Sequence, residues 1–201
     1  MEPEPSCGGI RRIAYDDHRV VPWKNGGGTT REIAIGGATA EDGDWGWRIS
    51  MAGVAQDGPF SVFPGIDRII VVIDGTGMDL VRQDGAVLPL EPFHPVSFPG
   101  DEPVEGRLRD GPIRDLNVMT RRGSCTASME VVEGPAETKI ETGPGEVLLV
   151  HVLAGTCRLQ PDGGDPCDAA GSNTLLHDGQ GACTLSPGEA SRVAVIRICC
   201  L

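Results

Sequence analysis

Apolar and polar residues alternate along short segments of the chain, and clusters of turn residues separate these segments. Residues 29–35, 45–52 and 114–119 alternate with a period of two, which is typical of β-strands with one buried face. Residues 68–73 form an almost continuous β-branched run, which predicts a buried central strand. Short strands that recur in this way favour an all-β barrel or sandwich.

The second half of the chain has the same strand pattern but a different content. Residues 129–132, 145–153 and 191–198 are predicted strands, and glycine-rich turns separate them. Every Trp, Tyr and Phe lies at or before Phe98. Because ligand pockets usually have aromatic walls, we place the candidate site in the first half and interpret the second half as a supporting barrel.

Composition and charge narrow the classes of function. The chain has 201 residues, with 29 Gly, 16 Pro and 4% aromatic residues, so turns are frequent and long helices are not expected. The net charge is −12, and no basic cluster could neutralise a row of phosphates, which disfavours nucleic-acid binding. No apolar run is long enough to span a bilayer, and residues 1–10 lack the features of a signal peptide. We therefore expect a cytoplasmic protein without a membrane partner.

Neither the cysteines nor the histidines have the spacing of a metal site. The 7 cysteines include no C-x-x-C pair, and their odd number without a secretion signal fits reduced thiols. The 4 histidines include no H-x-H pair, and only His94, between Phe93 and Pro95, is near the aromatic-rich region. No nucleophile elbow and no phosphate-binding loop is found. The sequence therefore predicts no metal and no cofactor, and it identifies no catalytic residue.

A glycine-rich loop precedes the first alternating strand. Gly26-Gly27-Gly28 allow a positive φ or a close approach of the backbone, and they follow Trp23, Lys24 and Asn25. The loop opens into the strand that carries Glu32. This arrangement predicts a binding loop at the mouth of a barrel, where Lys24 and Asn25 could contact a polar end of a ligand.

Further motifs follow this loop in order along the first half of the chain. Together with the loop they are Val21–Ile35, Trp47–Ala52, Gly58–Ser61, Phe63–Arg68, Phe98–Asp101 and Asp115–Arg122. This set resembles the signature of the HutD/Ves family of small bacterial proteins. The resemblance implies two fused cupin barrels of the jelly-roll, RmlC-like type. We expect an N-terminal barrel at residues 1–124 that holds the ligand pocket, and a C-terminal barrel at residues 125–201.

Strand alternation separates a polar face from an apolar face in three of the predicted strands. The residues of the polar faces are Thr30, Glu32, Ala34, Arg48, Ser50, Asp115 and Asn117. These faces either line the barrel lumen as a ligand site or meet water while the apolar faces fill the barrel. The second arrangement is the commoner one in β proteins. We favour the lumen, because these side chains are short and of mixed charge and coincide with the family motifs.

Within such a lumen Arg48 is the expected main anchor of the ligand. A guanidinium offers a planar fork that matches a carboxylate. Glu32 and Asp115 would either hold Arg48 in place or meet a donor on the ligand. The sequence therefore predicts a site for a small carboxylate.

Two further candidates have an equally simple structural explanation. Arg68 begins the β-branched strand and could reach the rim of the site, or it could pair at the surface with Asp67 or Asp74. Phe60 could form a wall of the site or belong to the core. The sequence leaves both alternatives open.

The resemblance implies a role in bacterial histidine utilisation, through binding of an intermediate such as urocanate, N-formylglutamate or formate. All three carry a carboxylate, which suits Arg48. The alternative is a metal-independent hydrolase or isomerase of a small acyl amino acid, with Glu32 or Asp115 as general base. A third alternative is a purely structural barrel with a closed apolar lumen. Monomer and homodimer both remain open.

Overall fold

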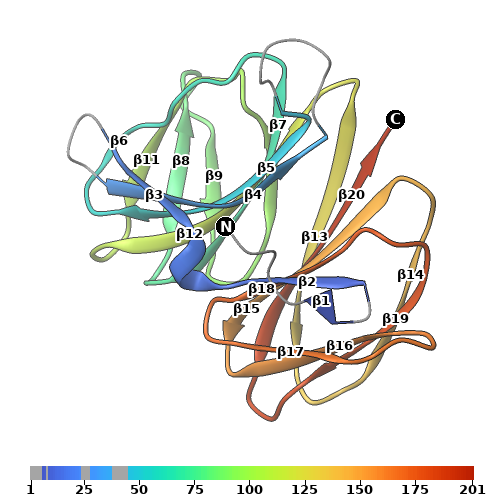
Figure 1. Cartoon of the computed structure of the whole chain (residues 1–201). Helices are drawn as coiled ribbons and strands as arrows, with labels where there is room; N and C mark the ends of the chain where they lie inside the picture. Colours follow the sequence, from blue (N-terminus) through green and yellow to red (C-terminus); the bar gives the residue numbers. More distant parts are fainter. Residues whose placement is uncertain (1–5, 8, 24–27, 38–44) are drawn as a thin grey trace. The chain divides into compact units, whose positions relative to one another are not determined.

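The computed structural model describes residues 6–7, 9–23, 28–37 and 45–201, and β-strands make up nearly all of its regular structure (Figure 1). The exception among these residues is η1, a 3-10 turn at Tyr15–Asp17. Within the described part of the chain, no helix is long and apolar enough to cross a membrane. The all-β class predicted from the alternating segments is confirmed.

The chain forms two compact units. Residues 19–127 make one, here called the N-terminal unit, and residues 1–18 join residues 128–201 in the other, here called the C-terminal unit. The sequence predicted a division between residues 124 and 125. In the structure the first 18 residues belong instead with the C-terminal half of the chain.

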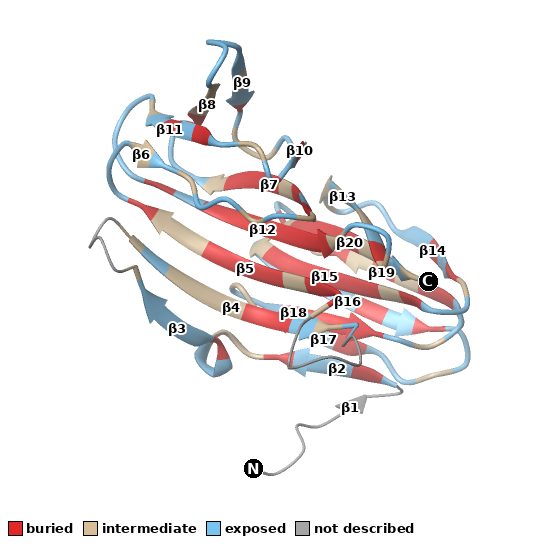
Figure 2. Cartoon of the chain, turned by 90° about the horizontal axis from the view of Figure 1, so that it is seen from above, coloured by how far each residue is buried: buried red, intermediate tan, exposed pale blue. Residues whose placement is uncertain are grey.

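The N-terminal unit consists of two antiparallel sheets. The larger has the strand order β10-β7-β12-β5-β4-β3, with β3 Arg19–Pro22, β4 Gly28–Gly36, β5 Trp47–Val54, β7 Ile66–Asp74, β10 Val96–Pro99 and β12 Ile113–Arg121. The smaller has the order β6-β11-β8-β9, with β6 Gly58–Pro59, β8 Met78–Arg82, β9 Val87–Leu90 and β11 Val104–Leu108. Strand β12 is largely buried, whereas the edge strand β3 is exposed along its length (Figure 2).

Apolar side chains from both sheets form the core of the N-terminal unit. Ile70 and Val72 of β7 contribute from the larger sheet, and Met78 and Leu80 of β8 contribute from the smaller one. All four side chains are fully buried. The β-branched run predicted to be a central strand is therefore the strand that carries this core.

The C-terminal unit also has a six-stranded and a four-stranded sheet. The larger has the order β1-β2-β18-β15-β20-β13, with β1 Ser6–Cys7, β2 Ile10–Ile13, β13 Cys125–Glu133, β15 Glu146–Ala154, β18 Thr174–His177 and β20 Arg192–Cys200. The smaller has the order β14-β19-β16-β17, with β14 Thr138–Thr142, β16 Thr156–Pro161, β17 Cys167–Ala170 and β19 Gly181–Pro187.

The pairing of β2 with β18 explains why the first residues belong to the C-terminal unit. Ile10 lies opposite His177, and Ile13 lies opposite Thr174. Ile10 is fully buried and packs in the same apolar cluster as Leu148 of β15. This burial removes apolar surface from water, which favours the long-range pairing of the two chain ends.

The cysteines of the described residues differ in burial and in bonding. Cys157, Cys167 and Cys183 are buried in the core of the C-terminal unit, and burial raises the pKa of Cys157 to about 12. Cys125 and Cys200 are disulfide-bonded. The prediction of reduced thiols is therefore wrong for these two residues, because the sequence spacing gave no sign of them.

A bulge in β4 changes the predicted alternation. Glu32 pairs with Ser50, but Ala34 pairs with Ile49, so the register shifts by one residue at Ile33. A bulge places residues beyond it on the opposite face. The sequence predicted that Ala34 shares a face with Glu32, and this prediction is wrong. Beyond the bulge, Ile35 is 52% exposed.

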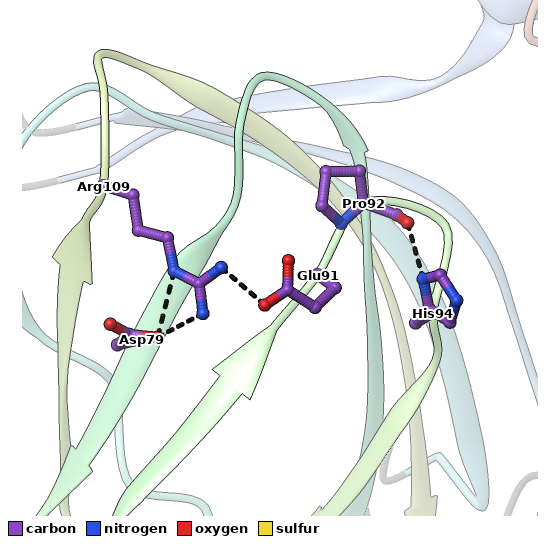
Figure 3. Close-up of polar contacts among 5 residues, drawn as sticks. All are labelled: Asp79, Glu91, Pro92, His94 and Arg109. Carbon is purple, nitrogen blue, oxygen red and sulfur yellow. Dashed lines mark hydrogen bonds and ion pairs between the residues drawn. The ribbon is translucent and has the colours of Figure 1, made fainter.

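In the N-terminal unit, an ion-pair cluster joins β8 to the segments that follow β9 and β11 (Figure 3). The Arg109 guanidinium donates to Asp79 Oδ1 at 2.7 Å and to Glu91 Oε1 at 2.6 Å. Asp79 lies in β8, while Glu91 follows β9 and Arg109 follows β11. His94 is exposed, and its Nδ1 lies 2.9 Å from the carbonyl oxygen of Pro92.

Candidate functional site

The floor of the candidate site is built from strand pairing in the larger sheet of the N-terminal unit. Residues that lie directly opposite one another on β4, β5, β12 and β7 form rows across the sheet, and rows two residues apart share one face. The rows are Thr30, Ala52, Asp115 and Val72, then Glu32, Ser50, Asn117 and Ile70, then Arg48, Met119 and Arg68.

Most residues of these rows line a cavity of about 600 Å³ in the N-terminal unit. The predicted site residues that line it are Thr30, Arg48, Ser50, Phe60, Arg68, Asp115 and Asn117. Glu32 is absent from the lining but holds Arg48. Lys24 and Asn25 lie outside the described residues. Binding of a ligand by these side chains stays a prediction, while their arrangement around one cavity is a structural fact.

Arg68 is the buried cation of this cavity. Its side chain is only 6% exposed, and its Nε donates to Asn117 Oδ1 at 3.4 Å. Of its predicted surface partners, Asp67 binds Arg122 and Asp74 binds Arg114 instead. Among the ion pairs of the described residues, none includes Arg68, so its charge has no direct counter-ion there.

Three phenylalanine rings surround the Arg68 guanidinium. The guanidinium carbon lies 5.3 Å from the ring centroid of Phe60, 5.6 Å from that of Phe63 and 5.1 Å from that of Phe98. These distances are in the range of cation–π contacts. We call this group the aromatic cage; Arg68 lines the cavity together with Phe60 and Phe63 of this cage.

Two glycines make room for the aromatic cage. A Cβ atom on Gly106 would lie 2.7 Å from Cε2 of Phe60, and one on Gly100 would lie 3.3 Å from Cδ of Arg68. Sequence reasoning missed both glycines, and it missed Phe63 and Phe98 as neighbours of Arg68. The available signal was the clustering of aromatic residues and glycines between residues 58 and 106.

Burial shifts the pKa values of both central ionisable groups. Burial raises the pKa of Asp115 to about 7, although the Arg68 charge and a backbone hydrogen bond from Ala52 both act to lower it. Burial lowers the pKa of Arg68 to about 10, while Asp115 opposes this change and Arg48 adds to it. Arg68 therefore remains charged at neutral pH, whereas Asp115 titrates there.

Arg48 has a counter-ion within the protein. Its Nε lies 2.8 Å from Glu32 Oε2, and both side chains are about one-fifth exposed, at 21% and 22%. This pairing is the one the sequence offered as an alternative, in which Glu32 holds Arg48. Arg48 was the expected main anchor, but the structure leaves Arg68 with less of its charge compensated.

The mouth of the cavity includes the described end of the glycine-rich loop. Trp23 Nε1 donates to Thr30 Oγ1 at 2.8 Å, and the Trp23 backbone N–H donates to the carbonyl of Gly28 at 2.9 Å. A Cβ atom on Gly28 would lie 2.1 Å from the carbonyl oxygen of Gly53. Only glycine fits at position 28, which explains the last member of the glycine run.

The cavity does not fit the metal centre that many cupin barrels hold. Its described lining has no histidine or cysteine, and the two guanidinium groups would repel a cation. No group of three or more His, Cys, Asp or Glu side chains suited to a metal ion occurs in the described ranges. The charges of the lining suit an anion instead.

Comparison with known proteins agrees with the fold and with the motifs. The chain is 34% identical over 172 residues to protein Ves of Citrobacter koseri, which covers 84% of this chain and 85% of the relative. It is 43% identical over 140 residues to an uncharacterized 21.2 kDa protein in the hutC 3' region of Pseudomonas putida, which covers 70% and 72%.

Solved structures share the same two-barrel architecture. HutD from Pseudomonas fluorescens SBW25 superposes with a TM-score of 0.82 at 30% identity, covering 96% of this chain and 99% of that one. A mutant of Bacillus subtilis oxalate decarboxylase superposes with a TM-score of 0.65 at 9% identity, covering 98% and 79%, and this likeness concerns the fold alone. The predicted cupin fold is confirmed. Since the HutD family model also matches residues 15–195, the chain belongs to the HutD family.

Proposed function

We propose that the N-terminal unit binds a small carboxylate, with Arg68 as the principal anchor. The observation that carries this proposal is a buried guanidinium in a cavity of about 600 Å³ without a direct counter-ion among the described residues. Burying an uncompensated charge is costly, and a bound carboxylate would offset that cost. Arg48, in the same row but separated from Arg68 by Met119, would meet a second polar group of the ligand.

The volume and lining of the site leave room for a ligand larger than formate. The cavity volume lies in the range of pockets for small organic molecules. Trp23 and Phe60 supply flat apolar walls, while Thr30, Ser50 and Asn117 supply hydrogen-bonding groups. Urocanate and N-formylglutamate combine a carboxylate with further polar atoms. Either could pack against the apolar walls and accept or donate hydrogen bonds to the polar side chains.

The family relation supports a role in histidine utilisation. One relative is encoded in the hutC 3' region, and the Pseudomonas fluorescens HutD was solved in a formate condition. We therefore propose that the protein moderates histidine utilisation in the cytoplasm by binding an intermediate of that pathway. Urocanate, N-formylglutamate and formate are the candidates to test first.

The test is a calorimetric titration of wild type and Arg68→Met with formate, urocanate and N-formylglutamate. Methionine keeps an unbranched apolar stem against the aromatic cage and removes the charge, so the fold should persist. In a separate thermal unfolding experiment, a ligand concentration a hundredfold above Kd should raise the free energy of unfolding of wild type by about 2.7 kcal/mol. We expect Arg68→Met to lose this binding.

The matched control is Arg82→Met, because Arg82 pairs with Glu102 and does not line the cavity. It should bind as wild type does. If wild type binds none of the three carboxylates, or if Arg68→Met binds them equally well, the proposed function is wrong.

A second function is favoured by the pKa of Asp115. A carboxyl group that titrates near pH 7 in a cavity is suited to general acid–base catalysis. The protein would then be a metal-independent hydrolase or isomerase of a small acyl amino acid. Incubation with N-formylglutamate or urocanate, followed by NMR, distinguishes the two functions: an enzyme consumes the compound and Asp115→Asn stops this, whereas a binding protein returns it unchanged.

A further inference from the structure

Asp115 and Arg68 are the central charged groups of one cavity, yet they do not form an ion pair with each other. Both side chains line the cavity, from β12 and β7 respectively. Asp115 is buried and interacts with Arg68 through its charge and with the backbone of Ala52 through a hydrogen bond. Within the described residues no salt bridge joins the two, but each shifts the pKa of the other through its charge, so an anion at Arg68 would also act on Asp115.

The other charged groups around Asp115 are already engaged or lie at the edge of the cavity. Arg48 of β5 is paired with Glu32 of β4. Asp57, after β5, accepts a hydrogen bond from the backbone N–H of Leu108 at 2.8 Å. The described lining from β6 and the segment after it, residues 58–61 and 63, contributes no titratable side chain. Asp115 is therefore the one described acid in the lining that is fully buried.

We propose that an anion binds at Arg68 together with a proton at Asp115. This inference rests on the proposed function. When Asp115 is ionised, its charge satisfies Arg68 through space and repels a second carboxylate. When Asp115 is neutral, the charge of Arg68 is uncompensated and can bind the ligand anion. The hydroxyl group of the neutral Asp115 can donate a hydrogen bond to the ligand. The site then holds one anionic group at Arg68 beside a neutral Asp115.

The linkage has a defined direction. In the free protein Asp115 titrates near pH 7, and a bound anion raises its pKa further. Below pH 7 the acid is already neutral, so binding needs no proton and affinity does not depend on pH. Above pH 7 each binding event takes one proton from solvent, and Kd rises about tenfold per pH unit. Arg68, with a pKa of about 10, stays charged up to pH 9.

The experiment measures Kd for formate and for acetate between pH 6 and pH 9 by calorimetry, in two buffers of different ionisation enthalpy. Both anions are fully ionised over this range, so any proton uptake comes from the protein. We expect an unchanged Kd from pH 6 to pH 6.5, a roughly tenfold rise from pH 7.5 to pH 8.5, and uptake of nearly one proton at pH 8.5.

Two variants separate Asp115 from other groups. Asp115→Asn should bind with a Kd independent of pH and close to the wild-type value at pH 6. Asp67→Asn changes an acid next to Arg68 that pairs outward with Arg122, and it should keep the wild-type pH dependence. The pH dependence of Kd in wild type is by itself enough to contradict the proton linkage, even if Asp115→Asn does not fold.

A wild-type Kd that is constant from pH 6 to pH 9 without proton uptake would overturn the proton linkage while leaving carboxylate binding intact. A pH dependence that persists in Asp115→Asn would assign the proton to another group and overturn the role of Asp115. Absence of binding at every pH would overturn the proposed function itself.

Discussion

Asp115 is a buried carboxyl group in the cavity, and its burial lowers the free energy of unfolding at high pH. Burial raises its pKa from the ordinary value of 3.8 to about 7 in the folded protein, so the folded state holds its proton more tightly than the unfolded state. Between these two values stability falls as pH rises, and above pH 7 the loss is complete. The loss amounts to about 4 kcal/mol at most.

We therefore expect Asp115→Asn to gain stability relative to wild type as pH rises from 5 to 8. Urea unfolding at pH 5, 6.5 and 8 measures this difference, and Asp67→Asn serves as the control with no such trend. A constant difference between Asp115→Asn and wild type across these pH values would contradict a buried, titrating Asp115.

The roles of single residues were harder to predict than their positions. Alternation placed Arg48, Asp115 and Asn117 on one face, and strand pairing brings them to one cavity. Alternation cannot say which guanidinium is neutralised, because that depends on partners from distant strands. Glu32 reaches Arg48 from β4, while Asp67 turns to Arg122 and leaves Arg68 without a counter-ion among the described residues.

At the scale of elements, strands were predictable and their irregularities were not. Segments with a period of two became β4, β5 and β12 within a few residues of their predicted limits. The bulge at Ile33 was not predicted, because the local sequence alternates on both sides of it and only pairing with β5 reveals the extra residue. A glycine inside a strand can mark a position where another side chain packs closely against the backbone, and the alternation of polar and apolar residues does not reveal such positions.

Gly106 of β11 is the strand glycine on which the aromatic cage depends. An alanine Cβ there would lie 2.7 Å from Cε2 of Phe60 and 2.9 Å from Sδ of Met78. We expect Gly106→Ala to displace the Phe60 ring, to cost about 1–3 kcal/mol of stability and to weaken formate binding. Urea unfolding and a formate titration measure the two effects.

Gly53→Ala is the matched control, since a Cβ on this strand glycine meets nothing closer than 3.9 Å. It should leave stability within about 0.5 kcal/mol and leave binding unchanged. If Gly106→Ala loses stability but binds formate normally, the position of Phe60 is not needed for the site.

At the scale of the whole molecule, the family resemblance predicted two barrels, and strand composition alone reached only the all-β class. The division of the chain could not be read from motif order, because residues 1–18 cross to the C-terminal unit. Ile10 and Ile13 flank two arginines, a pattern too short to show which sheet they join. Long-range pairing with β18 decides it, and that partner lies more than 150 residues away.

This topology predicts that a substitution near the N-terminus weakens the C-terminal half of the chain. Ile10 is fully buried in the C-terminal core, so Ile10→Ala should cost about 2–5 kcal/mol. Hydrogen exchange should rise in its neighbours β15 and β18, while β7 and β8 of the N-terminal unit keep more of their protection. Ile70→Ala, in the N-terminal core, is the matched variant and should give the opposite pattern. If both variants raise exchange equally throughout the chain, the two cores unfold as one cooperative unit, and the separation into two units has no energetic counterpart.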